Sequence, residues 1–326
     1  MRIVFLGTGE IGVPSLQALA ASAGHEVCAV FTQPDRPAGR DMKLRPSPVK
    51  LTAQTLGLPV FQPERIRRPD ALEQIKVLAP DLIIVVAYGQ ILPKALLDLP
   101  PRGCLNIHAS LLPRHRGASP INAALLAGDH ETGLTIMGMD EGLDTGDILL
   151  KEATLIGPQE TAGELHDRLA LLAPQALIKA LALIESGSAP REKQNDAFAT
   201  YAPKLSRKDG GIDWHRPAHE IDRHIRGMTP WPGAFTFLPG HPPELFKVHR
   251  AIVAESFTGA AGTILGTSPE GILVAADTEA ILLQEVQTAG GKRLKAAEFL
   301  RGHPLPMGTR FVESLAATIV VGEFKG

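Results

Sequence analysis

The sequence contains few cysteines, no long apolar run and no excess of charge of either sign. Cys28 and Cys104 are the only cysteines among 326 residues, which excludes a disulfide framework and the cysteine spacing of a zinc site. Met1 leads directly into the strand-like residues 2–6, so the charged and apolar regions of a signal peptide are missing, and no apolar run reaches the length of a membrane span. We therefore expect a cytoplasmic protein that binds neither a metal nor a membrane.

The charge balance excludes one way of binding nucleic acid, attraction through an overall positive charge of the protein. The formal net charge is −2, and 44% of the residues are hydrophobic, as in ordinary globular proteins. Any nucleic acid would have to be bound by local groups of basic residues. One such group lies in residues 33–48, where four prolines and a glycine exclude a helix or a central strand. The basic residues of this loop are Arg36, Arg40, Lys43 and Arg45.

Strands and helices alternate through the first half of the chain. Apolar, strand-like runs at 2–6, 26–32 and 81–87 are separated by helical patterns, and the β-branched run at 81–87 is the clearest buried strand. This alternation predicts an α/β fold with a parallel sheet and right-handed crossovers. Ligands of such sheets bind beyond the carboxyl ends of the strands.

The second half of the chain has a different pattern. Residues 187–210 are polar and have little apolar periodicity, which is typical of a linker. Five short strand-like runs with Gly and Pro turns follow, and they predict a small β-barrel. We therefore divide the chain into a catalytic domain at 1–189, a linker at 190–208 and a barrel domain at 209–326.

Asn106 and His108 stand out at the end of an expected strand at 104–108. Side chains alternate across a strand, so these two lie on the same face. A strand inside a parallel sheet should be apolar on both faces, which makes a polar pair at its carboxyl end unusual. Asn can stabilise a developing oxyanion and His can transfer a proton. Asp144, in an acidic turn at 140–147, could pair with a histidine or hold a water, although capping a turn is the commoner role of Asp.

Together these residues resemble the signature of the 10-formyltetrahydrofolate-dependent formyltransferases. The resemblance covers nearly the whole chain, and it rests on Asn106 to His108, Ser110 to Pro113, Arg116-Gly117, Asp144, the loop at 32–40 and Trp231-Pro232. It implies a Rossmann-like catalytic domain followed by an OB-like barrel that binds tRNA. The loop and the second domain narrow the resemblance to the branch that transfers a formyl group to the α-amino group of methionyl initiator tRNA, for translation initiation.

The resemblance also implies roles for individual residues. Asn106, His108 and Asp144 are expected to be catalytic. The co-substrate 10-formyltetrahydrofolate is expected to contact Tyr88, Gly89, Ser110, Leu111, Leu112 and Pro113. The tRNA is expected to contact Arg36, Arg40, Lys43 and Arg45 in the loop, Lys204 and Lys208 in the linker, and Lys292 and Arg293 in the barrel. No metal and no protein partner is implied.

Other functions fit parts of the sequence. Gly7 to Gly12 matches the G-x-G-x-x-G fingerprint of dinucleotide-binding enzymes, but the strand at 26–32 does not end in the acid that would hold a ribose. A non-catalytic RNA-binding module would leave Asn106, His108 and Asp144 without a purpose. Within the formyltransferases, an acceptor such as an amino sugar nucleotide or glycinamide ribonucleotide stays open, as does a formyltetrahydrofolate hydrolase.

Overall fold

The computed structural model describes residues 1–38, 43–254 and 259–312, and it divides into two compact units. Unit 1 comprises residues 1–120, 131–155 and 165–203. Unit 2 comprises residues 121–130, 156–164 and the described residues from 204 onward. Two short segments of the first half of the chain therefore pack with the second half.

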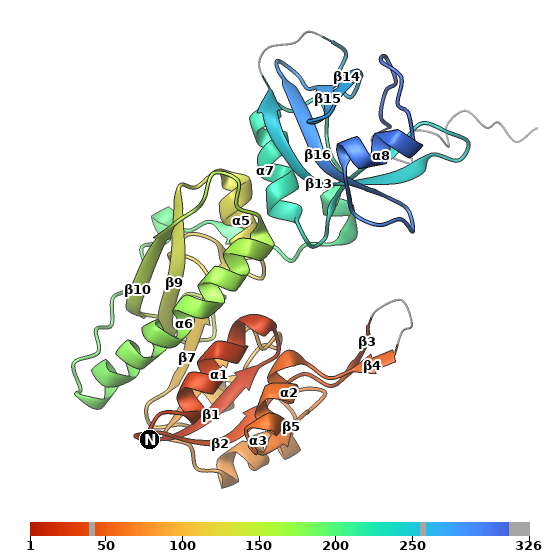
Figure 1. The fold of residues 1–326 in the computed structure, drawn as a ribbon. Coiled ribbons are helices and arrows are strands. Elements are labelled where there is room, and N and C mark those ends of the chain that lie inside the picture. Colours follow the sequence, from red (N-terminus) through yellow and green to blue (C-terminus); the bar gives the residue numbers. More distant parts are fainter. Residues whose placement is uncertain (39–42, 255–258, 313–326) are drawn as a thin grey trace, which may run out of the picture. The chain divides into compact units, whose positions relative to one another are not determined.

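Unit 1 is built on a seven-stranded sheet in the order β10-β9-β7-β6-β1-β2-β5 (Figure 1). Its parallel strands are β1 (Arg2–Gly7), β2 (Glu26–Phe31), β5 (Val60–Phe61), β6 (Leu82–Val86) and β7 (Cys104–His108). The expected Rossmann-like α/β fold is confirmed. The sheet continues with two antiparallel strands, β9 (Glu131–Gly138) and β10 (Ile148–Leu155).

The helices of unit 1 begin at local signals in the sequence. In α2, Pro48 occupies the first turn and the hydroxyl of Ser47 accepts a hydrogen bond from the Lys50 N–H at 3.0 Å, which satisfies an otherwise unpaired donor. An apolar cluster that includes Val4, Ile83 and Val85 packs beside the sheet. The bounds are η1 (Glu10–Gly12), α1 (Val13–Ala20), α2 (Pro48–Thr55), α3 (Pro69–Val77), α4 (Lys94–Leu97) and α6 (Ala162–Glu185), whose first residues count with unit 2.

The basic loop forms a small hairpin of its own. Strands β3 (Arg36–Ala38) and β4 (Lys43–Arg45) pair antiparallel, outside the main sheet, and place Arg36 opposite Arg45. Arg36, Lys43 and Arg45 are exposed. Arg40 lies outside the described residues. Like charges directly opposite each other across a strand pair are destabilising, so the pairing of Arg36 with Arg45 lowers the stability of the hairpin.

Unit 2 is an antiparallel sheet in the order β12-β13-β16-β15-β14, with β17 also paired to β16. The segment at 309–312 bonds to both ends of this order. The Val312 N–H donates to the Phe237 carbonyl in β12 at 2.9 Å, and the Ile264 N–H at the start of β14 donates to the Thr309 carbonyl at 2.8 Å. This segment closes the sheet, and the expected barrel is confirmed. The strands are β12 (Ala234–Leu238), β13 (Glu244–Ala254), β14 (Ile264–Ser268), β15 (Gly271–Ala275), β16 (Ala280–Thr288) and β17 (Leu294–Lys295).

Aromatic side chains fill the core of unit 2. Trp214 is fully buried and stacks on Phe311 at a centroid distance of 5.4 Å, and Phe311 stacks in turn on Phe246. The indole N–H of Trp214 donates to the hydroxyl of Thr236 at 3.1 Å, so its polar atom is satisfied inside the core. The remaining helices of this unit are α5 (Pro120–Ala127), η3 (Arg207–Gly210), α7 (Ala218–Met228) and α8 (Ala296–Gly302).

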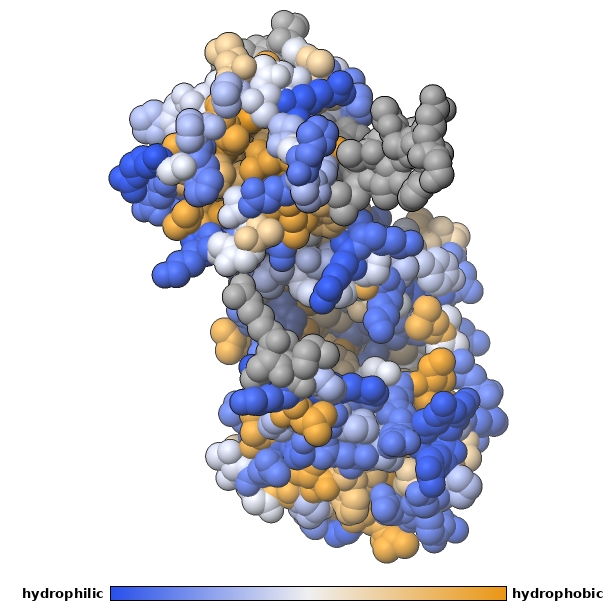
Figure 2. All heavy atoms as spheres, turned by 90° about the vertical axis from the view of Figure 1, so that its right-hand side faces the viewer, coloured by the Kyte–Doolittle hydropathy of each residue, from blue (hydrophilic) through white to orange (hydrophobic). Residues whose placement is uncertain are grey.

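The surface carries mixed side chains. Figure 2 shows hydrophilic side chains over most of the face in view, with apolar side chains in small groups between them. Within 1–38, 43–254 and 259–312, no helix combines the length and the apolar character that a membrane span requires. The same residues contain no group of three His, Cys, Asp or Glu side chains arranged to hold a metal ion.

Candidate active site

The candidate site lies at the carboxyl end of β7, in unit 1. His108 is the last residue of this strand and is 5% exposed. Asn106 pairs with Val85 of β6 on one side and Met137 of β9 on the other, and it is half-buried. Asn106 therefore lies between two apolar cross-strand neighbours, and it shares one face of the strand with His108, as the alternation of side chains requires.

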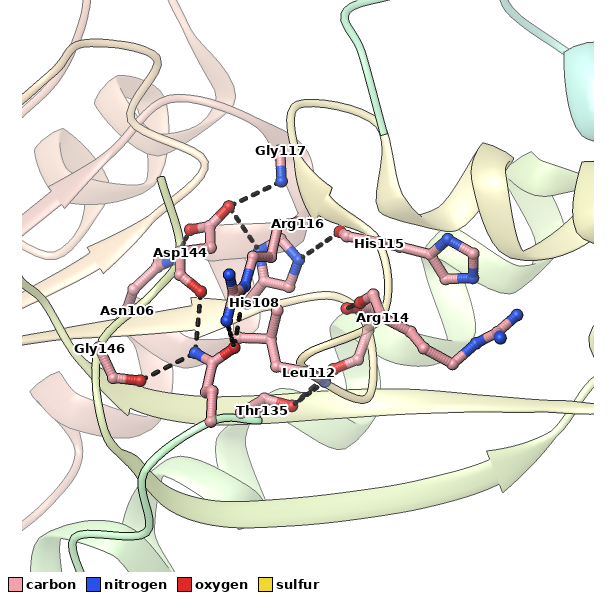
Figure 3. A network of polar contacts seen from close by, with 12 residues as sticks. Asn106, His108, Leu112, Arg114, His115, Arg116, Gly117, Thr135, Asp144 and Gly146 are labelled. Atoms are coloured by element: carbon pink, nitrogen blue, oxygen red, sulfur yellow. Dashed lines mark hydrogen bonds and ion pairs between the residues drawn. The ribbon is translucent and has the colours of Figure 1, made fainter. Parts of the chain in front are cut away.

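The structure brings Asn106, His108 and Asp144 together (Figure 3). The side-chain amide of Asn106 donates to Oδ1 of Asp144 at 3.3 Å, and the Gly117 N–H donates to Oδ2 at 2.8 Å. The same Oδ2 lies 3.6 Å from Nδ1 of His108. The carboxylate is thus held by two N–H donors and faces the imidazole.

The environment of His108 determines how it can act. Its Nε2 lies 2.9 Å from the carbonyl oxygen of His115. A carbonyl can only accept, so Nε2 carries a hydrogen and a neutral ring has its lone pair on Nδ1, facing Asp144. Burial lowers the pKa of His108, and the charge of Asp144 and the His115 carbonyl oppose that effect. A neutral imidazole that can take up a proton on the side of Asp144 is suited to general base chemistry.

The backbone around the site is strained. Ala87 after β6, His115 in the loop after β7, and Asp144 in its turn all have a positive φ, of 47°, 60° and 53°. Non-glycine residues rarely adopt this conformation, since each such residue costs about 1–3 kcal/mol and persists only where the surroundings enforce it. The strain lies where loops must turn sharply to present their side chains or backbone to one site.

A second layer of hydrogen bonds fastens the turn that carries Asp144. The side-chain amide of Gln194 donates to the carbonyls of Asp144 and Gly146, both at 2.8 Å. Its oxygen accepts from Nε and an NH2 group of Arg116, at 3.0 and 2.8 Å, and Arg116 also reaches Asp196. The sequence predicts no role for Arg116, and Gln194 falls in the expected linker at 190–208. A single Gln in a polar segment carries no signal of its own.

The expected folate residues divide into core and surface groups. The side chain of Tyr88 is 1% exposed within an apolar cluster, where burial raises the pKa of its hydroxyl, and its carbonyl accepts from Thr8 and Gln33. Gly89 follows with a φ of 82°. The Ser110 carbonyl accepts from the hydroxyl of Thr135, which itself accepts from the Leu112 N–H. Leu112 is buried, whereas Leu111 and Pro113 are half-buried.

The expected tRNA residues are distributed over both units. Arg36, Lys43 and Arg45 lie on the hairpin of unit 1, and the exposed residues Lys204, Lys208, Lys292 and Arg293 lie in unit 2. Arg293 forms an ion pair with Glu285. The structure shows where these side chains are attached, and their role in binding stays a prediction.

Comparison with known proteins places these features in a family. The family model for formyl transferases matches residues 1–181, and the model for the formyl transferase C-terminal domain matches residues 204–304. The chain is 52% identical over 314 residues to the methionyl-tRNA formyltransferase of Geobacter sulfurreducens. The match covers 96% of this chain and 98% of that protein. It is 49% identical over 317 residues to the methionyl-tRNA formyltransferase of Geotalea daltonii, with 97% and 100% covered.

A solved structure shares the fold. HypX from Aquifex aeolicus, in complex with tetrahydrofolic acid, matches 92% of this chain with a TM-score of 0.61 and 18% sequence identity. This chain spans 47% of that protein, and at this identity the likeness supports the fold alone.

Proposed function

This chain belongs to the formyltransferase family, and we propose that it transfers the formyl group of 10-formyltetrahydrofolate to the α-amino group of methionyl initiator tRNA. The observation that carries the proposal is the close approach of Asn106, His108 and Asp144 at the carboxyl end of β7. The relatives that match nearly the full length of the chain are methionyl-tRNA formyltransferases. We expect the reaction in the cytoplasm, at the start of translation.

Asn106 is the candidate donor to the oxyanion. One hydrogen of its side-chain NH2 group is directed to Asp144, and an amide has a second hydrogen to give. When the amine attacks the formyl carbon, a C–N bond forms and negative charge develops on the formyl oxygen. The second N–H of Asn106 can donate to that oxygen, and losing one such donor costs about 3–4 kcal/mol in the barrier.

His108 and Asp144 are the candidates for proton transfer. The attacking nitrogen must lose a proton, and N10 of the folate must gain one as its bond to the formyl carbon breaks. Nδ1 of a neutral His108 can take up the first proton, and the imidazolium that forms is stabilised by the carboxylate of Asp144 at 3.6 Å. The same proton is then available for N10, so no net proton is consumed.

A cysteine nucleophile is not expected to take part. Burial raises the pKa of the Cys104 thiol to about 12, and its Sγ donates weakly to the Leu96 carbonyl. Burial also raises the pKa of Cys28. Since the thiolate is the reactive form of cysteine, neither residue is activated. The amine can attack the formyl group directly, and holding the two reactants in position can supply roughly 7–11 kcal/mol.

We place the folate between the loop after β6 and the turn that carries Asp144, beside Tyr88, Gly89 and Ser110 to Pro113. Ile91 in the first of these loops is 89% exposed, and Leu143 in the turn is 59% exposed. The pKa of Lys94, just after the loop, is raised first by its hydrogen bond with Asp98 and to a smaller extent by the charge of Glu141 in the turn, so the two segments are near each other. Two exposed apolar side chains on facing loops suit a flat heterocycle.

The tRNA is proposed to bind through its phosphates. The hairpin holds Arg36 opposite Arg45, and a phosphate near the pair would relieve their repulsion. Arg40, which falls between these strands in the sequence, is part of the same proposal. Lys204, Lys208, Lys292 and Arg293 are candidates for contacts made by unit 2.

An assay of acceptors tests the function. The enzyme is given 10-formyltetrahydrofolate with methionyl initiator tRNA, glycinamide ribonucleotide, an amino sugar nucleotide or no acceptor, and the formylated products are quantified. We expect kcat/KM for the charged tRNA to exceed that for either small amine by at least about 1,000-fold, which corresponds to roughly 4 kcal/mol of selective binding. Formylation of a small amine at a comparable rate, or release of formate alone, would overturn the proposal.

A further inference from the structure

We propose that Gln194 is the positioning residue of Asp144, and that the buried guanidinium of Arg116 orients it. The expected kinetic effects rest on the proposed function. The hydrogen bonds from which the role is inferred involve only residues of unit 1. The four hydrogen bonds of the Gln194 side chain go to Arg116 and to the carbonyls of Asp144 and Gly146 rather than to Asn106 or His108. It acts through the backbone of the turn that carries the carboxylate.

The side chain of Gln194 uses its full hydrogen-bonding capacity. An amide has two N–H donors and two acceptor positions on its oxygen. Both donors are directed to backbone carbonyls, those of Asp144 and Gly146, and the oxygen accepts twice from Arg116. A fully satisfied amide at a half-buried position has one favourable orientation, so the turn is held at a defined place.

Arg116 makes the orientation of the amide unambiguous. Its side chain is only 2% exposed, and a guanidinium has donors but no acceptor. The group that faces it must therefore be the oxygen of Gln194, which leaves the NH2 group for the carbonyls of the turn. The carboxylate of Asp196, which is 83% exposed, also pairs with the charge of Arg116, at 2.8 Å.

The backbone on both sides of Gln194 is fixed to unit 1. Glu192 exchanges two backbone hydrogen bonds with Ile148 at the start of β10, at 2.8 and 3.0 Å. Further along, Tyr201 and Ala202 form β11 (Tyr201–Ala202), which pairs in parallel with β8 (Arg116–Gly117). Gln194 is therefore supported by the strand next to the turn and by the strand that supplies the Gly117 N–H.

The turn needs such support because Asp144 has a φ of 53°. Its carboxylate is held by Asn106 at 3.3 Å and by Gly117 at 2.8 Å, and these bonds do not hold its backbone. If the carbonyls of Asp144 and Gly146 lose their donors, the turn can relax and carry the carboxylate away from His108. A displacement of about 1 Å in such a group can reduce turnover about 100-fold.

The substitution Gln194→Glu tests the role with the smallest change in shape. It keeps the oxygen that faces Arg116 and replaces the NH2 group with a second oxygen, which repels the carbonyls of Asp144 and Gly146. We expect kcat to fall about 10- to 100-fold, with KM for tRNA and for folate within about threefold of the wild type. Gln74→Glu is the matched control, because Gln74 is exposed on α3, and its kcat should not change.

A double-mutant cycle separates positioning from a general structural defect. If Gln194 acts through Asp144, adding Gln194→Glu to Asp144→Asn should reduce kcat less than twofold further. A structural readout that needs no activity is the amide resonance of Gly117, whose N–H donates to Asp144. In Gln194→Glu this resonance should move toward its position in Asp144→Asn. If Gln194→Glu melts below the assay temperature, Gln194→Asn replaces it, because the shorter amide cannot reach both sides.

Two outcomes would overturn the inference. One is a folded Gln194→Glu variant with wild-type kcat and an unmoved Gly117 resonance. The other is a loss of kcat that multiplies fully with that of Asp144→Asn. Failure of the proposed function has a different signature, since the wild type would then formylate no charged tRNA while the Gly117 resonance still reports whether Gln194 positions Asp144.

Discussion

At the scale of single residues, the carboxylate of Asp144 makes the sharpest prediction. Asp144→Asn keeps the shape of the side chain but cannot accept from both Asn106 and Gly117 or stabilise a charged His108. We expect kcat to fall by at least about 100-fold, the usual contribution of a group that assists proton transfer. The Kd of a folate analogue, measured by titration, should stay within about threefold. A variant with more than a third of wild-type kcat would remove Asp144 from the mechanism.

The protonation of His108 makes a second prediction at this scale. Burial lowers its pKa from the ordinary value of about 6.5, so the imidazole is neutral at pH 7 and becomes charged only in more acidic solution. If the neutral ring is the base, kcat is constant near pH 7 and falls only in solution more acidic than the ordinary titration range of histidine, because the pKa is lowered. A single-turnover pH profile measures this limb. An activity that rises as the pH falls from 7 to 5 would show that the charged ring is required.

The residues that the sequence reveals are those that break a local rule. Asn106 and His108 are polar in a strand of the sheet interior, and Asp144 lies in a turn with several acids and glycines. Gln194 does not stand out in the sequence, because a polar residue in a polar segment is ordinary. The burial of Arg116 is equally hard to predict, since arginine is usually exposed and its half-buried partner Gln194 comes from 78 positions away.

At the scale of elements, the short pairing of β8 with β11 depends on Gly117. Its φ is 120°, and a Cβ there would lie 2.5 Å from the carbonyl oxygen of Ala202. Gly117→Ala must therefore separate the two strands and move the N–H that holds Asp144. We expect kcat to fall at least about 100-fold, as for loss of the Asp144 contact itself, with a lower Tm in thermal melting. Gly57→Ala is the control, because Gly57 also has a positive φ but its Cβ would meet open space.

The control separates backbone strain from the clash. If Gly57→Ala and Gly117→Ala lower Tm and kcat to the same extent, the contact with Ala202 has no special importance, and β8 does not position the site.

The hairpin of β3 and β4 makes the second prediction for an element. Arg36→Ala removes one of two opposed positive charges, so the free protein should not lose stability. If Arg36 contacts a phosphate, KM for the charged tRNA rises and the slope of log K against log salt falls by about one unit. Arg65→Ala, at another exposed arginine of unit 1, is the control. Equal salt slopes for both variants and the wild type would exclude Arg36 from the tRNA contact.

Elements with a strong apolar pattern are predictable from the sequence, and those made by distant pairing are not. The run of β-branched residues at 81–87 predicts a buried strand, and β6 spans Leu82–Val86. No periodicity in the sequence indicates that β9 and β10 run antiparallel to their neighbours. β8 and β11 contain two residues each and are separated by more than 80 positions, so no local signal marks them.

At the scale of the whole molecule, the change of composition near residue 190 separates an α/β pattern from a barrel pattern. The exact boundaries at 189 and 209 stay a prediction. Residues 121–130 and 156–164 belong to unit 2 because specific contacts hold them there. The side chain of Asn122 donates to the Gly227 carbonyl at 2.7 Å, and the Gly163 N–H donates to the Thr229 carbonyl at 3.0 Å. Such contacts between distant segments cannot be seen in a linear pattern.

The central claim is that the formyl group passes directly from the folate to the charged tRNA. A rapid-quench single turnover with labelled formyl on the folate measures this transfer. We predict that label leaves the folate and reaches methionyl-tRNA at one rate, and that none is bound to protein at any time. Label that accumulates on the protein before it reaches the tRNA, or that leaves as formate while the tRNA stays unformylated, would contradict direct transfer by Asn106, His108 and Asp144.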